Sequence, residues 1–174
     1  MKHRLTRLLA FVGIAAGLAG ALRLAKELPE AWVSSDVHAI QSPDDLTVRF
    51  KEQHILRPAF FPEGLSWPPR EILARGGRDF AVLMHFDRAG SEQIVLALSQ
   101  RLPTAPRLPT RIDPAREIQN DVVTVGGTPG HVSLARCSDG GACNRVTWER
   151  HGYDVELTGR LPEQELLRIA GSVR

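Results

Sequence analysis

The body of this chain lacks any cluster of basic residues. Of its 174 residues, 22 are Lys or Arg and 20 are Asp or Glu, which gives a formal net charge of +2. Much of the positive excess lies in Lys2, Arg4 and Arg7, and no acidic residue precedes Glu27. Farther along, arginines are scattered among acids, whereas a nucleic-acid-binding face needs Lys and Arg gathered on one surface. The sequence therefore excludes a nucleic-acid partner.

The short motifs of common enzymes are also missing. No Gly-x-Ser-x-Gly elbow is present. The glycine-rich segment 126–130 has no lysine in the phosphate-binding position and precedes a predicted strand rather than a helix. That segment is predicted to be a turn. We therefore predict a non-enzymatic protein without a cofactor, the alternative being a hydrolase whose site is assembled from distant residues.

Candidate metal ligands and catalytic acids are few, and each has an ordinary structural interpretation. Asp36 and His38 offer two ligands in a strand, but no third ligand has a credible position, so no metal site is predicted. The acidic pair 44–45 suits acid/base chemistry, yet it follows Ser-Pro and indicates a turn or a helix start. His85 lies in a predicted strand on the face opposite Phe86, where a half-buried, hydrogen-bonded histidine is expected.

Cysteine is scarce, because Cys137 and Cys143 are the only two. They flank a strong turn sequence, and a hairpin centred on Gly140 places them opposite each other on the solvent face. Directly opposed residues lie about 4.5–5.5 Å apart, which is within disulfide reach. The alternatives are free thiols and a zinc site completed by His131 and His151, but those histidines lie too far along the strands. We predict a disulfide, and hence an oxidising compartment.

A basic segment and an apolar run begin the sequence. The apolar run extends from Leu8 to Leu22 and ends at Arg23, an order typical of a secretory signal. The run is shorter than the roughly 20 residues of a membrane span, but residues 8–25 together could serve as an anchor. Cleavage after Ala21 and retention as an anchor both stay open. Either outcome places the rest of the chain outside the cytoplasm, in the periplasm or on the outer face of the inner membrane, and an anchored N-terminus would be cytoplasmic.

Beyond this signal or anchor (residues 1–25), residues 26–57 form a linker or ambiguous segment and residues 58–174 form the extracytoplasmic domain. Within the domain, alternating apolar residues predict a hairpin centred on Ala89, which pairs Met84 with Ile94. A further strand is predicted over 118–125.

The C-terminal part of the domain has the clearest patterns. Strands over 131–137, 143–150 and 153–159 are predicted to form a meander. Its registers pair Val132 with Trp148 and Trp148 with Val155. A helix follows from Pro162, with an apolar row at Leu166, Ile169, Ala170 and Val173. The predicted fold is α+β: a twisted antiparallel sheet of about six or seven strands packed by a C-terminal helix, preceded by an N-terminal signal-anchor helix.

Two irregular segments are candidates for recognition. Residues 102–114 contain four prolines and predict an extended, exposed connection that crosses between parts of the sheet, with a recognition segment as the alternative. The aromatic residues Phe60, Phe61 and Trp67 are the candidate ligand or partner surface. Their structural alternative is a plug at the end of the sheet.

Three segments together resemble a known family. They are Pro58-Ala-Phe-Phe-Pro-Glu-Gly-Leu65, the strands Val146-Thr-Trp148 and Tyr153–Gly159, and the closing segment Leu161–Val173. They are similar to a bacterial extracytoplasmic domain family of unknown function, which occurs in the outer halves of anti-sigma-factor-like membrane proteins and in related lipoproteins. The resemblance covers residues 58–173 and implies a sheet with a C-terminal helix and a role in envelope sensing or regulation. It supplies no catalytic residues. Only about seven residues precede the apolar run, which is too few for a sigma-binding domain.

These observations lead to one expected function and one alternative. We expect a non-enzymatic envelope accessory or regulatory domain that binds a membrane or periplasmic protein partner, with the membrane contacted through residues 8–25 if they are retained. The alternative is a carrier or sensor of a small apolar, lipid-like ligand held between the sheet and the helix.

Overall fold

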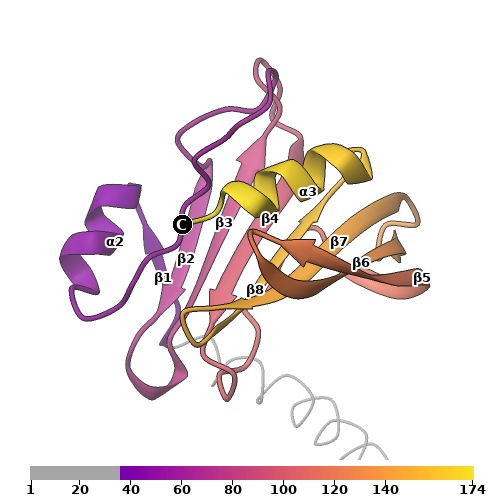
Figure 1. Ribbon diagram of the computed structural model, residues 1–174. Coiled ribbons are helices and arrows are strands. Elements are labelled where there is room, and N and C mark those ends of the chain that lie inside the picture. The colour runs from indigo at the N-terminus through magenta and orange to yellow at the C-terminus, as the bar shows by residue number, and fades with distance from the viewer. Residues whose placement is uncertain (1–35) are drawn as a thin grey trace, which may run out of the picture. The chain divides into compact units, whose positions relative to one another are not determined.

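The computed structural model describes residues 36–174, in which His38–Arg174 form one compact unit. Eight antiparallel strands make one open sheet in the order β1-β2-β3-β4-β8-β7-β6-β5 (Figure 1). The strands are β1 (His38–Ile40), β2 (Glu71–Arg75), β3 (Ala81–Asp87), β4 (Ile94–Arg101), β5 (Pro114–Val125), β6 (Thr128–Cys137), β7 (Ala142–Arg150) and β8 (Tyr153–Gly159). The helices are α2 (Pro43–Arg49) and α3 (Glu163–Ser172). The predicted antiparallel sheet and C-terminal helix are confirmed. The sheet has eight strands rather than six or seven, since the short strands β1 and β2 were not predicted from the sequence.

One side of the sheet, called here the first face, carries the main core. Its buried side chains alternate along the strands, as in Val82, Met84 and Phe86 of β3. Helix α3 covers this face through contacts with β5, β7 and β8. All four residues of its predicted apolar row, Leu166, Ile169, Ala170 and Val173, are 0% exposed, which confirms the prediction.

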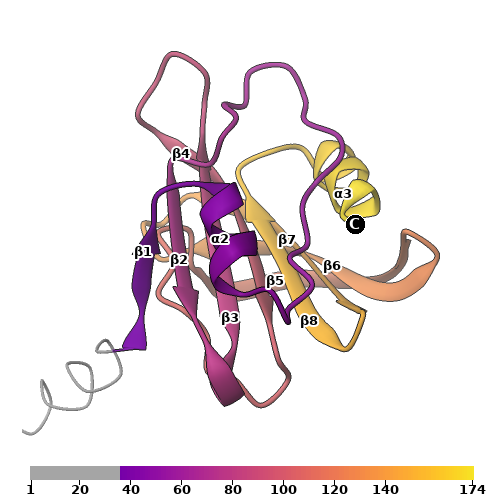
Figure 2. The same ribbon diagram turned by 90° about the vertical axis from the view of Figure 1, so that its left-hand side faces the viewer.

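The segment before β2 belongs to the same unit. Helix α2 begins at the Ser42 cap, whose hydroxyl oxygen accepts a hydrogen bond from the backbone N–H of Asp45 at 3.2 Å. The acidic pair 44–45 is therefore a helix start. Leu46 of α2 and Leu56 after it join the main core at 0% and 1% exposure. Figure 2 shows α2 and α3 on the same side of the sheet, so residues 38–57 contribute to the fold rather than only leading into it.

The opposite side, the second face, is covered by the proline-rich connection. Residues 102–113 run from β4, in the middle of the sheet, to β5 at its edge. The crossing is as predicted, but the expected exposure is wrong for Ala105, Leu108 and Ile112, which are 2%, 6% and 2% exposed. They are buried because the second face of the central strands is itself apolar, with Leu83 and Val95 both 2% exposed.

The hairpin registers were predicted with mixed success. The predicted pair Trp148–Val155 is confirmed, and Val146 pairs with Leu157 in the same register. In the preceding hairpin Val132 pairs with Val146 instead of Trp148, a shift of two residues. Met84 pairs with Leu98 instead of Ile94, because the β3–β4 turn is longer than predicted. Both shifts are even numbers of residues, so every side chain keeps its predicted face within its own strand.

The predicted disulfide is present on the predicted face of the sheet, but it is buried rather than exposed to solvent. Cys137 and Cys143 are bonded with their Cα atoms 5.9 Å apart. Both are 2% exposed and pack with Ile112 and Ala135 in a small second core. The prediction of solvent exposure failed because Ile112, from the proline-rich connection, covers this part of the second face.

The predicted signal-anchor segment, residues 8–25, and the cleavage position after Ala21 lie outside the described residues. Among residues 36–174, neither helix has the length and apolar character needed to cross a membrane.

Candidate functional site

The predicted aromatic surface lies on a segment that is hydrogen-bonded to the rest of the fold at both ends. Its segment is fixed at one end by backbone hydrogen bonds between Arg57 and Arg174, at 3.0 Å in each direction, and at the other by Ser66 N–H donating to the Asp87 carbonyl at 3.0 Å. The Phe61 ring lies 5.1 Å from the Trp67 ring and 5.2 Å from the Phe86 ring. These contacts hold the three rings together at the end of β3.

Exposure differs among the three predicted aromatic residues. Trp67 is 48% exposed although its ring stacks on the fully buried Phe86 at 6.3 Å. Phe61 is partly buried beside it. Phe60 lies apart, under the guanidinium group of Arg168 from α3, whose central carbon is 3.9 Å from the ring centroid. The structure therefore brings Phe61 and Trp67 together and places Phe60 against α3.

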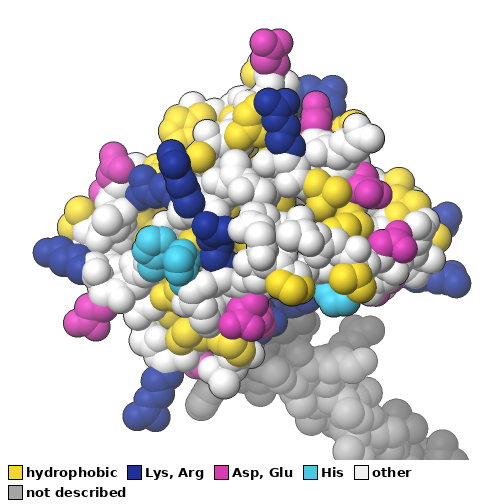
Figure 3. Space-filling view, viewed as in Figure 1, with side chains coloured by type: hydrophobic (Ala, Val, Ile, Leu, Met, Phe, Trp, Pro, Cys, Tyr) yellow, Lys and Arg dark blue, Asp and Glu magenta, His cyan; other side chains and the backbone are white. Residues whose placement is uncertain are grey.

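The surrounding surface is chemically mixed. The Arg70 side chain beside this cluster lies 3.5 Å from Asp87 and 3.7 Å from Glu92. On the face seen in Figure 3, hydrophobic side chains are interspersed with basic and acidic ones. An aromatic group surrounded by a polar, solvent-accessible rim is the usual composition of a protein-binding patch.

A second constellation, which sequence reasoning missed, surrounds His85 on the second face. Its Nδ1 atom lies 2.9 Å from Glu71 Oε2, and its Nε2 atom lies 3.2 Å from Thr110 Oγ1. The backbone N–H of Arg111 donates to Nε2 at 3.3 Å, and the Arg111 guanidinium pairs with Glu71. Nε2 is therefore an acceptor, so Nδ1 carries the proton and donates it to Glu71.

Charge at this cluster follows from burial. His85 is 0% exposed, and its burial lowers the pKa of the imidazole despite the neighbouring Glu71 carboxylate. Burial also opposes ionisation of Glu71, but hydrogen bonds from Arg111 and His85 outweigh it and lower the pKa of that carboxyl. The stable state is thus a neutral His85 beside an ionised Glu71.

Glu71, His85 and Thr110 have the order of a catalytic triad, but their contacts indicate a structural latch. His85 is sealed from solvent, and Nε2 already accepts from Arg111. The Thr110 hydroxyl group also contacts Ile112, since its oxygen accepts from the Ile112 N–H at 3.2 Å and lies 3.3 Å from the Ile112 carbonyl oxygen. The cluster therefore fastens the proline-rich connection to β2 and β3.

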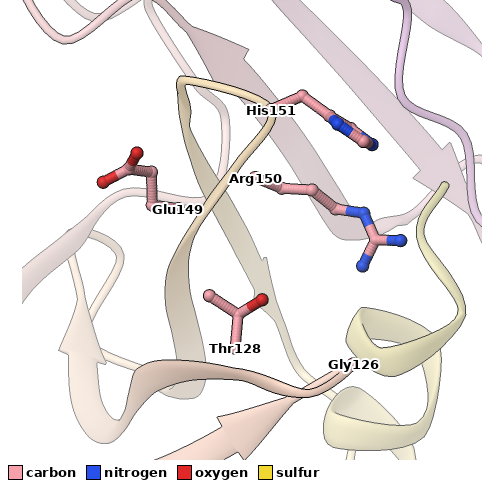
Figure 4. Close-up of a pocket in the computed structure, with 5 residues that line it drawn as sticks. All are labelled: Gly126, Thr128, Glu149, Arg150 and His151. Atoms are coloured by element: carbon pink, nitrogen blue, oxygen red, sulfur yellow. The ribbon is translucent and has the colours of Figure 1, made fainter.

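A third site is an open pocket of about 530 Å³ at the ends of β7 and α3 (Figure 4). It is lined by Gly126, Thr128, Glu149, Arg150 and His151. Arg150 and His151 extend to one side of the β7–β8 hairpin and Glu149 to the other. The Arg150 Nε atom is buried without a hydrogen-bond partner. Its Nη1 atom would lie 2.9 Å from a Cβ atom added at Gly126, and the φ of +57° at that position favours glycine.

Arg150 has an evident structural use in this pocket. Its guanidinium group lies near the C-terminal end of α3 (Figure 4), a helix with no basic residue in its last turn. A cation there offsets the negative end of the helix dipole. Hydrogen-bond donors on Arg150, His151 and Thr128 line the pocket, and donors of this chemical type can bind an oxyanion. No sequence signal pointed to this pocket, because Arg150 and Gly126 meet only through the fold.

The predicted alternatives for metal binding can be placed as well. His131 lies in β6 opposite Thr147, whereas His151 lies in the β7–β8 turn, with its ring 4.8 Å from that of His54. The cysteines of the zinc alternative form the disulfide instead. Among residues 36–174, no group of three or more His, Cys, Asp or Glu side chains is arranged to hold a metal ion.

Comparison of the chain with protein families, with curated proteins and with solved structures found no match.

Proposed function

We propose that this chain is a non-enzymatic accessory or regulatory domain of the cell envelope that binds a protein partner through Phe61 and Trp67. The observation that carries the proposal is the half-exposed Trp67 ring, which is held against the buried Phe86. A tryptophan ring fixed in this way loses little conformational freedom on binding, and such anchors dominate the energetics of many interfaces.

The compartment is inferred from the disulfide. A bond between Cys137 and Cys143 persists in an oxidising environment, which fits the export signal predicted from residues 1–25. The resemblance to envelope-regulatory domains over residues 58–173 points to the same setting. A partner in the membrane or the periplasm follows from that location.

The alternative, a lipid-like ligand held between sheet and helix, has no observation in its favour. The α3 side chains that face the sheet, including Leu166 and Ile169, are 0% exposed and pack directly into the main core. A ligand would have to displace them.

The test is affinity capture of the full chain from detergent-solubilised membranes of cells that naturally contain it. Wild type, Trp67→Ala and Val48→Ala are compared, because Val48 is another exposed apolar residue, 67% exposed and on α2. We expect a specific partner that Val48→Ala retains and Trp67→Ala loses by about tenfold or more.

Thermal unfolding of both variants checks that the fold is intact. A partner captured equally by a folded Trp67→Ala variant, or no specific partner with the wild type, refutes the proposal.

A further inference from the structure

The outer edge of β5 is the longest free strand edge of the described sheet. β5 spans Pro114–Val125 and pairs only with β6, whereas β1 at the opposite edge has three residues. Its side chains include Val122 and Ile118, which are 76% and 60% exposed. An edge that combines unpaired backbone groups with exposed apolar side chains is a template for another strand.

The adjoining turn determines which backbone groups are free. Gly126 and Gly127, with φ of +57° and +86°, form a two-residue turn closed by the pair Val125–Thr128. The pair that closes such a turn exchanges both of its hydrogen bonds, and hydrogen-bonded pairs then alternate along the ladder. Gln119, Asp121 and Val123 therefore direct their N–H and C=O groups toward β6. Those of Asn120, Val122 and Thr124 point outward.

The regular part of this edge is bounded on both sides. The Gly126–Gly127 turn ends it at one side, and a register shift between Glu117 and Gln119 ends it at the other. The segment between these limits, residues 119–125, has Val122 at its midpoint. A two-fold axis through Val122 would thus pair every outward backbone group of one chain with the same segment of a second chain.

We propose that β5 is a self-association surface, on which a second copy of this chain pairs antiparallel about Val122 to continue the sheet. In this register Val122 packs against its own counterpart, and Asn120 lies opposite Thr124. About six backbone hydrogen bonds form along the outward positions. The result is a closed two-fold dimer, because the same patch serves both subunits.

Two neighbouring registers, with the axis through Asp121 or through Asn120, are less favourable. An axis through Asp121 would place two carboxylates directly opposite each other, which is destabilising. An axis through Asn120 would require the irregular Ile118 position to pair with Val122. The Val122 axis avoids both problems, since Asp121 then lies opposite Val123. This surface is separate from Phe61 and Trp67, so the inference does not rest on the proposed function.

Site-directed disulfide cross-linking of the full chain in a non-ionic detergent tests both the surface and the register. We expect Val122→Cys to form a cross-linked dimer under mild oxidant on a non-reducing gel, because opposed Cα atoms of a hydrogen-bonded pair lie about 5.5 Å apart. Asn120→Cys alone should not cross-link, since the two copies of residue 120 would lie about 13 Å apart along the strands. The double variant Asn120→Cys/Thr124→Cys should cross-link again.

Sedimentation equilibrium in the same detergent gives an independent measure. The wild type and a Val48→Lys control should have the mass of a dimer, and Val122→Lys that of a monomer. Because Val122 is mostly solvent-exposed, this variant should keep its fold. A monomeric wild type, a dimer that persists in Val122→Lys, or equal cross-linking of Val122→Cys and Asn120→Cys would each overturn the proposal.

Discussion

The two faces of the sheet are covered by different means. On the first face, α2 and α3 bury apolar rows, and Leu46 and Leu166 are both 0% exposed. On the second face, a connection without helix or strand is fastened by the polar contacts of His85 with Thr110 and Arg111, and by Arg107, which lies 2.8 Å from Glu156. The helical cover follows from the local periodicity of apolar residues. The loop cover has no such periodicity and combines a few buried apolar side chains, such as Leu108 and Ile112, with specific hydrogen bonds. The first face should therefore govern global stability, and the second face local opening.

The largest expected effect is on the first face. Leu166→Ala should lower the free energy of unfolding by about 3 kcal/mol, because it removes a fully buried side chain and leaves a cavity under α3. Denaturant unfolding measures this loss. Leu167→Ala is the matched control, since Leu167 is only partly buried and should cost clearly less. Equal losses in the two variants would show that the predicted apolar row does not secure α3.

A smaller and more local effect is expected on the second face. Glu71→Ala leaves the Nδ1–H group of the buried His85 without its acceptor, which should cost about 1–2 kcal/mol. Limited trypsin digestion should then cleave faster after Arg107 and Arg111 than in the wild type, because the connection opens without global unfolding.

Glu92→Gln is the control for this digestion, since the Glu92 side chain is 91% exposed. Leu166→Ala should instead accelerate cleavage throughout the chain. If Glu71→Ala gave the pattern of Leu166→Ala, the proposed difference between the two faces would be lost.

The smallest expected effect is a dependence on pH. His85 has a lowered pKa in the folded state, so below its ordinary value of 6.5 the unfolded chain binds a proton that the folded chain does not. Stability from this group is full above about pH 6.5 and falls as the pH decreases. Glu71, with its lowered pKa, adds a further loss below its ordinary value of 4.5.

Denaturant unfolding between pH 7.5 and 5, flanking the ordinary pKa of histidine near 6.5, should therefore show wild-type stability decreasing with acidification. A His85→Gln variant should show a flatter profile. A wild type that gains stability on acidification through this range would contradict the neutral latch.

Local sequence signals were sufficient where the structure itself is local. The His151-Gly152 turn, with positive φ at both residues, set the Trp148–Val155 register correctly. The β3–β4 register failed because six residues, 88–93, connect the strands and no dipeptide marks the turn. The shift at Cys137 arose similarly, because its turn sequence allows more than one centre.

The missed parts of the candidate sites depend on contacts between distant positions. His85 contacts Glu71 and Thr110, which are 14 and 25 residues away in the sequence. No sequence motif identifies either residue as its partner. Its complete burial, where half-burial was expected, follows from the loop that folds over it. By contrast, Phe61 and Trp67 could be selected from the sequence, because aromatic residues in an irregular segment need no distant partner to be noticed.

The strand order has a kinetic consequence. β1–β4 and β5–β8 are two meanders whose strands pair with their neighbours in sequence, and only the β4–β8 ladder joins them. Gly159 lies at this seam, where an added Cβ atom would come within 2.8 Å of the Leu96 side chain. Forming the seam closes a loop of more than fifty residues, and such non-local pairing is slow. Pairing of β4 with β8 should therefore limit the rate of folding, and a side chain at Gly159 would collide there with Leu96 and the Val95 carbonyl.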